Sequence, residues 1–316
     1  MRKLSAKEWW EELQGISYVP TQQICAALSL AQVLEKPILV EGPPGAGKTS
    51  LAKAAARVLG AKLVRLQCYE GIDASRALYE YNYGKQLLYL NALRDRVSQV
   101  LNGTKSLAEA VDVLDREAPF WGEEFLVRRP VLEALAPVDG KPRVLLVDEV
   151  DRSDREFEAL LLEALSDWAV SIPEFGTIVA REKPLVLLTS NRTRDLSDAL
   201  RRRCLYLWLD LPDRERETKI IRAQVPGASE RFARKVAEFL AEYRKASPKH
   251  VPSVAEAIEL AAALLATSGE EFGASEIEAA LAVFAKNKDD VRLGVRAAEK
   301  LFKDSGEREE RGAESA

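Results

Sequence analysis

A glycine-rich loop near residue 45 constrains the fold of this chain more than any other feature. It fits the phosphate-binding pattern G-x-x-x-x-G-K-S/T and reads Gly42-Pro43-Pro44-Gly45-Ala46-Gly47-Lys48-Thr49. Glycines allow positive φ angles, so consecutive N–H groups can point inward at phosphate oxygens. The loop stands between an apolar strand at 37–40 and a helix at 50–59, which is the context that the motif requires.

The residue types of this loop predict the role of each position. We expect Lys48 to neutralise the β- and γ-phosphates and Thr49 to bind Mg²⁺. The helix that begins near Lys48 adds unsatisfied N–H groups and the positive end of its dipole. The nucleotide-binding residues predicted for this segment are Gly42, Pro43, Pro44, Gly45, Ala46, Gly47, Lys48, Thr49 and Ser50.

Two further apolar strands end in polar side chains. The strand at 144–147 is followed by Asp148 and Glu149, and the strand at 185–189 is followed at short distance by Asn191. In a P-loop protein, Asp148 is expected to hold Mg²⁺ through its water shell, and Glu149 to orient and polarise the attacking water. Ligands of open α/β sheets bind at the carboxyl ends of strands, so Asn191 is expected to help position that water.

Composition bounds the class of protein. The length of 316 residues suggests about two domains, and 46 basic against 50 acidic residues leave no global basic field for nucleic acid. The three cysteines lack metal-ligand spacing and read as reduced, mostly buried thiols. The longest apolar stretch, 260–266, is too short to span a bilayer, and the N-terminus has no apolar segment of a signal peptide. We therefore expect a cytoplasmic protein.

Strands alternate with helices as far as Pro212, and beyond it only helical periodicity remains. This order predicts an α/β fold with a parallel sheet between helices, followed by an all-α region. The segment 71–142 reads as mainly helical, with Leu90, Leu93, Val97 and Val100 on one face, a turn at Asn102-Gly103 and a Ser106/Glu109 cap. Strands are predicted at 37–40, 62–67, 144–147, 185–189 and 205–209, and helices at 5–13, 21–34, 50–59, 214–223, 230–243, 253–265, 275–284 and about 290–302. Capping boxes are predicted at Ser5/Glu8, Ser253/Glu256 and Ser275/Glu278.

The glycine loop, the Asp148-Glu149 pair, Asn191 and a late arginine cluster together resemble an AAA+ ATPase. More specifically, the chain resembles the MoxR branch and, within it, the CoxD-like and NorQ/CbbQ-like proteins, over about residues 16–300. The stretches that carry this resemblance are 68–71 with 79–83, a hairpin at 171–178, and 188–191 with 199–204. The resemblance implies a P-loop AAA+ core followed by an all-α helical lid.

The resemblance also implies a division of the chain. We expect an N-terminal helix at 1–15, a nucleotide-binding core at 16–211 and a helical lid at 212–302. A helical insert is expected within the core at about 72–140. The last segment, 303–316, is charged and has no large apolar side chain, so its composition predicts disorder.

Several roles are implied by the resemblance alone. Arg203 matches the arginine-finger position best, with Arg202 next, and Tyr18 and Val19 match the segment that lines the adenine pocket. A sensor-2 arginine is expected near the start of a lid helix, but that position falls on Ala255. Arg292 and Arg296 are the alternatives that the sequence offers, and neither is assigned.

The function that the resemblance implies is an ATP-hydrolysing, chaperone-like machine that uses Mg²⁺. It would form a homo-oligomeric ring, expected to be a hexamer. It would remodel or mature a metalloenzyme, such as a client oxidoreductase, together with a von Willebrand factor A domain protein. The alternatives are a nucleic-acid motor or loader, which the acidic balance disfavours, and a nucleotide-gated scaffold, which an intact Glu149 disfavours.

Two other patterns in the sequence have competing interpretations. Tyr79, Tyr81 and Tyr83 are compatible with a substrate-gripping pore loop, with a subunit interface or with packing inside the insert, and packing is favoured. The run 287–290 matches the guanine-reading pattern N-K-x-D, but it lies in the helical C-terminal region, far from the expected sheet position. We therefore do not interpret the chain as a GTPase.

Overall fold

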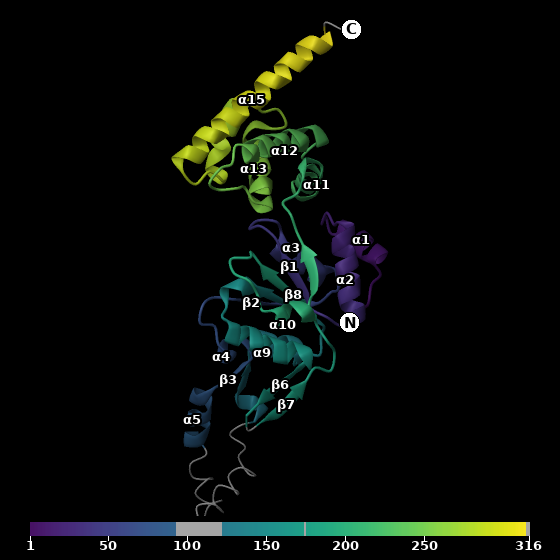
Figure 1. Ribbon diagram of the computed structural model, residues 1–316, viewed down its shortest axis with the longest axis vertical. Coiled ribbons are helices and arrows are strands. Elements are labelled where there is room, and N and C mark those ends of the chain that lie inside the picture. Colours follow the sequence, from purple (N-terminus) through teal and green to yellow (C-terminus); the bar gives the residue numbers. More distant parts are fainter. Residues whose placement is uncertain (93–121, 174, 314–316) are drawn as a thin grey trace, which may run out of the picture.

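A five-stranded parallel sheet forms the centre of the structure, which is a computed structural model describing residues 1–92, 122–173 and 175–313. The strand order is β2-β5-β8-β1-β9, and every neighbouring pair is parallel. Figure 1 shows helices on both sides of this sheet, as predicted. The strands are β1 (Ile38–Glu41), β2 (Lys62–Gln67), β5 (Arg143–Asp148), β8 (Leu185–Ser190) and β9 (Leu205–Trp208).

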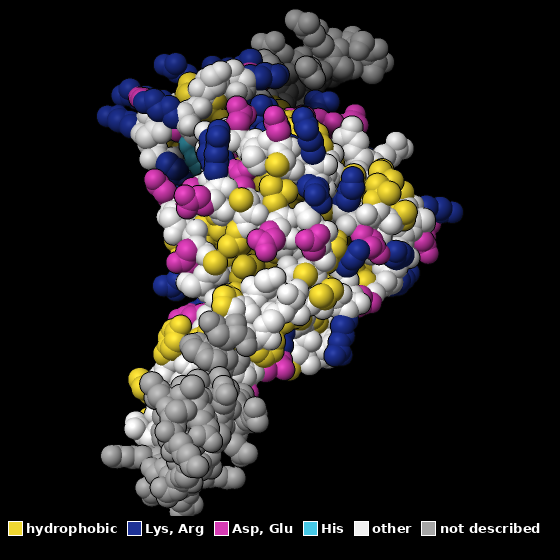
Figure 2. Space-filling model, turned by 60° about the horizontal axis from the view of Figure 1, so that its bottom comes forward, with side chains coloured by type: hydrophobic (Ala, Val, Ile, Leu, Met, Phe, Trp, Pro, Cys, Tyr) yellow, Lys and Arg dark blue, Asp and Glu magenta, His cyan; other side chains and the backbone are white. Residues whose placement is uncertain are grey.

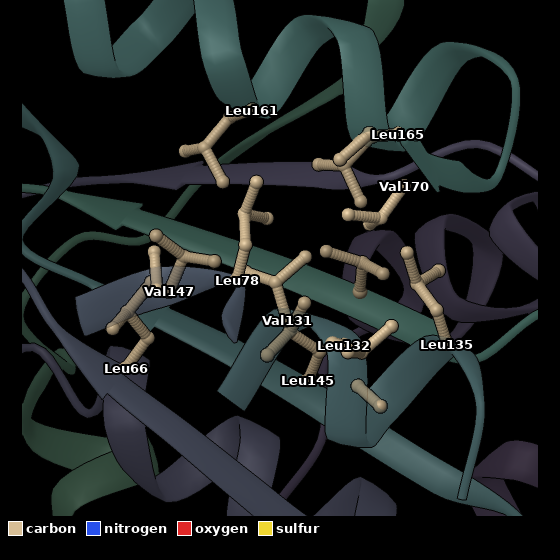
Figure 3. Close-up of a cluster of buried hydrophobic side chains, with 14 of the residues drawn as sticks. Leu66, Leu78, Val131, Leu132, Leu135, Leu145, Val147, Leu161, Leu165 and Val170 are labelled. Carbon is tan, nitrogen blue, oxygen red and sulfur yellow. The ribbon is translucent and has the colours of Figure 1, made fainter. Parts of the chain in front are cut away.

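Alternating side chains of the central strands pack into two separate apolar clusters, one on each face of the sheet. Leu145 and Val147 of β5 belong to one cluster, whereas Val144 and Leu146 belong to the other. This follows from the two-residue period of a strand, because both faces of a parallel sheet are buried. Figure 3 shows the first cluster, where Leu161 and Leu165 of α9 (Arg155–Ser166) lie over the strands.

The helices of the core begin where their caps predict. Ser5 and Glu8 form the expected capping box, and Thr21 caps the second helix through Ile24 N–H. Trp9 is fully buried and donates from Nε1 to Gln32 Oε1 at 3.1 Å, which joins the first two helices. The core helices are α1 (Ala6–Gly15), α2 (Gln22–Leu34), α3 (Lys48–Val58), α9 (Arg155–Ser166) and α10 (Asp198–Arg203), with a 3₁₀ turn η2 (Val150–Arg152) after β5.

The described part of the segment 71–142 contains helical elements, as expected, and also a short sheet that the sequence did not predict. A two-stranded antiparallel sheet pairs β3 (Tyr79–Tyr81) with β4 (Leu126–Arg128). Each strand has only three residues and its partner is far away in sequence, so no local period reveals either of them. The helical elements here are α4 (Ala74–Ala77), α5 (Tyr83–Ala92), η1 (Glu123–Phe125) and α8 (Pro130–Leu135). The predicted shared face from Leu93 onward, the turn at Asn102-Gly103 and the Ser106/Glu109 cap lie outside the described residues.

A hairpin precedes β8, as the resemblance implied for 171–178. Its strands are β6 (Ala169–Ile172) and β7 (Gly176–Val179), which pair antiparallel. Tyr81 Oη donates to the Pro173 carbonyl at 3.3 Å, so the hairpin contacts the β3–β4 sheet. The hairpin is therefore placed against the base of the insert.

The chain beyond Pro212 forms a helical unit with its own core. Phe232, Phe239, Tyr243, Leu260 and Phe284 are fully or almost fully buried in this unit. Its helices are α11 (Arg214–Gln224), α12 (Glu230–Lys245), α13 (Val254–Ser268), α14 (Ala274–Ala280), η3 (Leu281–Val283) and α15 (Lys288–Ala313). The residues described here include no strand, which confirms the expected all-α region.

Two boundaries in this unit differ from the prediction. The Ser253/Glu256 capping box is present, but the box expected at Ser275/Glu278 lies two residues earlier, where Gly273 N–H donates to Glu276 at 2.8 Å. The segment expected to be disordered, 303–316, continues α15 as far as Ala313 (Figure 1). Its Glu, Arg and Lys residues are good helix formers, so a lack of apolar side chains did not imply a lack of helix.

Two expectations from composition concern membrane-spanning helices and the three cysteines. Within the part of the chain that the structure describes, no helix combines the length and apolar character needed to cross a membrane. Cys25 and Cys68 are buried, Cys204 is partly buried, and all three are free thiols. Both observations agree with the expectations from the sequence.

The lid core makes a first prediction. Leu260→Ala removes a fully buried side chain, so we expect the free energy of unfolding of the lid to fall by about 2–5 kcal/mol. Glu259→Ala, an exposed neighbour on the same helix, is the matched control and should change stability by less than about 0.5 kcal/mol. Urea denaturation followed by circular dichroism measures both. Equal midpoints for the two variants would contradict a separate lid core built around Leu260.

Candidate functional site

The glycine-rich loop joins β1 to α3, and its backbone explains its composition. Gly45 and Gly47 have φ angles of +81° and +93°, in the region that favours glycine. A Cβ at Gly42 would lie 2.0 Å from the Leu209 carbonyl oxygen, so any side chain there would clash with the backbone. The loop therefore depends on glycine at these positions for its shape.

Lys48 is buried under this loop. Its ammonium donates to the carbonyl oxygens of Gly42 at 2.7 Å and Pro43 at 2.9 Å. Burial lowers the pKa of Lys48 from its usual value, and nearby carboxylates, Asp151 first, oppose that shift. The ammonium group is therefore held by two carbonyl oxygens of the glycine loop. The sequence predicts that this group binds phosphates.

The carboxyl end of β5 brings Asp148 to Thr49, as the sequence predicted. Thr49 Oγ1 lies 3.2 and 3.3 Å from the two carboxylate oxygens of Asp148. Thr189 Oγ1 donates to Asp148 Oδ1 at 2.5 Å and accepts from Glu149 N–H at 2.9 Å. Thr189, which sequence reasoning missed as a site residue, therefore orients the Asp148 carboxylate and holds the backbone of Glu149.

The oxygen atoms of Thr49 and Asp148 suit Mg²⁺. This ion prefers hard oxygen ligands and keeps several waters, usually binding through one or two carboxylates plus substrate phosphates. The described residues contain no cluster of three or more His, Cys, Asp or Glu that would form an all-protein cage. A hydroxyl and one carboxylate beside a phosphate-binding loop fit that mode of binding.

Glu149 follows Asp148 in a left-handed conformation, with φ of +56°. Such a conformation is uncommon for a residue with a side chain and clusters at functional sites. Its Oε2 accepts from Gln67 Nε2 at 2.9 Å and from Arg152 at 3.1 Å, and Asn191 Nδ2 lies 3.5 Å from Oε1. The structure therefore brings Glu149 and Asn191 together, as predicted.

Strand β2 contributes two side chains that the sequence did not identify. Arg65 forms an ion pair with Asp148 Oδ2 at 2.6 Å, and Gln67 contacts Glu149. Their positions follow from the β2–β5 register, in which Gln67 lies opposite Asp148. That register is a long-range pairing, so the sequence offered only a polar strand end as a signal.

Asp151 organises the loop after β8. It is buried, and its Oδ2 accepts from Thr193 Oγ1 at 2.7 Å, Thr193 N–H at 2.9 Å and Asn191 N–H at 3.2 Å. Its other carboxylate oxygen has no hydrogen-bond partner among the described residues. Asp151 thus holds the backbone that presents Asn191, a role that the acidic run 148–151 did not reveal by itself.

The arginine cluster lies on α10, whose three arginines differ in their surroundings. Arg201 points inward and pairs with Glu41 at 3.2 Å. Arg202 and Arg203 are exposed, and neither side chain makes an ion pair or hydrogen bond with the residues that the structure describes. Both side chains are therefore free for contacts outside this copy of the chain.

A cavity of about 580 Å³ lies between the core and the lid, beside the glycine loop. Tyr18 and Val19, which the resemblance assigns to the adenine pocket, line this cavity, and burial raises the pKa of Tyr18 to about 12. Arg216 of α11 donates to the Val19 carbonyl at 3.2 Å and ties the lid to this wall. The volume of this cavity lies in the range of small-molecule binding sites. Further lining residues include Ala46, Gly47, Ser50, Ala54, Ile220, Val254 and Ile258.

The start of α13 packs directly on the glycine loop. Val254 N–H donates to the Gly45 carbonyl at 3.0 Å. Ala255, at the expected sensor-2 position, is exposed in the first turn of this helix. Arg292 and Arg296 lie on α15 and do not line the cavity, so the structure supports neither as a substitute.

The tyrosines of the insert and the N-K-x-D pattern lie elsewhere. Tyr81 is buried, and its ring lies 6.2 Å from that of Tyr79 and 6.5 Å from that of Tyr83, although Tyr83 itself is exposed. Packing therefore accounts for Tyr81. Asn287 and Asp290 exchange hydrogen bonds at 2.6 and 2.9 Å at the start of α15, far in the fold from the sheet. Asn287 therefore caps the start of α15.

The strand–loop–helix unit, the paired acids on β5 and the polar end of β8 define a P-loop nucleotide-binding protein. The model of the AAA family, described as the ATPase family associated with various cellular activities, matches residues 38–207, which is more than half of the chain. The chain therefore belongs to the AAA family of ATPases.

Two known proteins show the extent of the similarity. The chain is 31% identical over 188 residues to the proteasome-activating nucleotidase of Methanocella arvoryzae, covering 55% of this chain and only 40% of that protein. Among solved structures it is similar to the RuvB Holliday junction branch migration motor of Thermotoga maritima. That similarity has a TM-score of 0.41 and 18% identity, and covers 90% of this chain and 68% of the other.

The contact of α13 with the loop makes a second prediction. A Cβ at Gly45 would lie 2.4 Å from Ser253 Cβ, whereas a Cβ at Gly47 would meet nothing within 4 Å. Both Gly45→Ala and Gly47→Ala carry the cost of a positive φ, about 1–2 kcal/mol. We expect only Gly45→Ala to displace the lid, seen as faster hydrogen exchange of the Val254 amide. Equal exchange at Val254 in the two variants would show that this contact does not hold the lid.

Proposed function

We propose that this AAA ATPase is a chaperone-like machine of the MoxR branch that remodels or matures a partner metalloenzyme. The observation that best supports its ATP hydrolysis is the convergence of Lys48, Glu149 and Asn191 at one edge of the sheet. The hairpin before β8 and the insert between β2 and β5 support the choice of branch. The client oxidoreductase and the von Willebrand factor A domain partner rest on the resemblance alone.

In the proposed mechanism, the glycine loop and Lys48 bind the phosphates of ATP. Glu149 accepts a proton from the attacking water, and Asn191 holds that water in place through its amide. The adenine end would occupy the cavity beside Tyr18 and Val19. Glu149 is already held by Gln67 and Arg152, so its carboxylate is aimed before substrate arrives.

Thr49 and Asp148 would hold Mg²⁺, which supplies positive charge against the transferred phosphoryl group. Arg65 now pairs with Asp148 and is half exposed, so its side chain has room to swing away. Thr189 keeps the Asp148 carboxylate oriented whichever partner it has.

We further propose that neighbouring copies complete each other's sites in a ring, expected to be a hexamer. Arg203, with Arg202 as the next candidate, would reach the phosphates bound by the adjacent copy and stabilise charge in the transition state. Their exposure and lack of described partners support this role. On the face shown in Figure 2, acidic and basic side chains are interspersed over the middle of the molecule, which does not favour a nucleic-acid motor.

Hydrolysis gives the third prediction. Lys48→Ala should abolish ATP binding, because it removes the buried cation of the loop. Glu149→Gln should retain binding but lower kcat by about 10²–10⁴-fold, the usual contribution of a general base. Glu156→Gln, an exposed acid in the first turn of α9, is the control and should retain full activity. Phosphate release and calorimetric binding measure these effects, and an active Glu149→Gln enzyme would contradict the assigned base.

The partner gives the fourth prediction. In the presence of ATP, the Glu149→Gln variant should stay in its ATP-bound state and keep the partner protein that binds to this state, because hydrolysis is slow. Affinity capture with this variant, against Lys48→Ala as the non-binding control, should enrich a von Willebrand factor A domain protein or an oxidoreductase subunit. Capture of nuclease-sensitive nucleic acid in their place would overturn the maturation function in favour of a nucleic-acid motor.

A further inference from the structure

Glu41 is a buried carboxylate at the end of β1 that the proposed mechanism does not use. Only 1% of its surface is exposed, and it directly precedes the glycine loop. Its Oε1 lies 3.2 Å from Arg201, and its Oε2 lies 3.2 Å from Tyr206 Oη and 3.7 Å from Arg192 Nε. Desolvation of a buried ion pair often cancels its attraction, so stability alone is a poor explanation for this arrangement.

The partners of Glu41 come from three different segments around the site. Arg201 belongs to α10, Tyr206 belongs to β9, and Arg192 directly follows Asn191. Arg192 has a φ of +57° and lies over the Trp208 ring at 5.9 Å, so its backbone is held in an uncommon conformation. Glu41 therefore joins the glycine loop, the polar end of β8 and the arginine helix.

The anchoring of α10 decides where its other arginines point. This helix has only six residues, so it has little stability of its own and depends on contacts at its ends. Ser197 caps the start of α10, and Leu200 in its middle is buried. Arg201 attaches the last turn of the helix to Glu41. Successive helical residues point about 100° apart, so fixing Arg201 also sets the directions of Arg202 and Arg203.

We propose that Glu41 is a positioning residue for the arginines that this chain offers to the site of a neighbouring copy. Through Arg201 it orients Arg203, and through the peptide bond to Gly42 it links that orientation to the chain's own glycine loop. This inference rests on the proposed arginine-finger function and names how that function is controlled.

The link to the chain's own site runs through Lys48. Its ammonium donates to the Gly42 and Pro43 carbonyl oxygens. When phosphates attract Lys48, these carbonyls lose a strong donor, and the adjoining peptide of Glu41 can readjust. The state of one site would thus reach the arginines presented to the next site, which coordinates hydrolysis around the ring.

Glu41→Gln tests this role with little change in volume. The backbone contacts of position 41, including Leu209 N–H to the Glu41 carbonyl at 2.8 Å, do not involve the side chain. We expect Glu41→Gln to lower kcat by about tenfold while nucleotide affinity stays within about twofold. Glu35→Gln, an exposed carboxylate near the start of β1, is the control and should leave kcat unchanged.

A double variant separates positioning from a direct effect on the chain's own site. Arg203→Ala should lower kcat by about 10³-fold or more, and Glu41→Gln should add nothing in that background, because both changes disable the same group. If Glu41→Gln slows the Arg203→Ala enzyme by its full factor, the inference is overturned. If neither Arg203→Ala nor Arg202→Ala lowers kcat, the arginine-finger proposal fails, and the inference fails with it.

Mixed assemblies give a readout that a purely structural role would not move. Glu149→Gln copies hydrolyse ATP slowly, but they keep Lys48 and Glu41 and therefore carry normally positioned arginines. Added to Glu41→Gln copies, they should raise the rate per Glu41→Gln copy, and no rise would overturn the inference. Arg201→Lys, which keeps the charge but loses the planar fork of arginine, should behave like Glu41→Gln and serves if that variant does not fold.

Discussion

Parallel hydrogen bonding of β1 with β8, and of β8 with β5, is the constraint on which the rest of the structure depends. Parallel strands end at the same edge of a sheet, so the segments that follow them meet there. Val147 lies opposite Leu188, and Glu41 lies opposite Ser190. The glycine loop, the paired acids and Asn191 are therefore neighbours because of this register, and a slip of one residue would separate them.

At that edge, hydrogen bonds orient the charged groups before any ligand binds. Thr189 holds Asp148 and the backbone of Glu149 together, while Asp151 holds the backbone of Asn191. Such preorganisation matters because fixed dipoles and charges need not be rearranged during the reaction. The lid adds a backbone contact from Val254 to Gly45, so the loop that meets phosphate is also the loop that the lid touches.

The strands and long helices were predictable because their signals are local. β2 was predicted with its observed limits, and the capping boxes at Ser5 and Ser253 mark real helix starts. Short elements held by distant partners were not predictable, and β3 with β4 is the clear example. Helical continuation to Ala313 was missed because low hydrophobicity was taken as a sign of disorder.

The sequence by itself determined the glycine loop and the order of strands and helices, and it predicted Lys48, Thr49, Asp148, Glu149 and Asn191 as site residues, because each of these depends on chemistry within a few neighbouring positions. Only the tertiary structure decided that Arg65 and Gln67 reach the acids of β5, and that Glu41 pairs with Arg201, 160 positions away. These contacts depend on strand order and register, which are set by packing of the whole sheet. No local pattern encodes them.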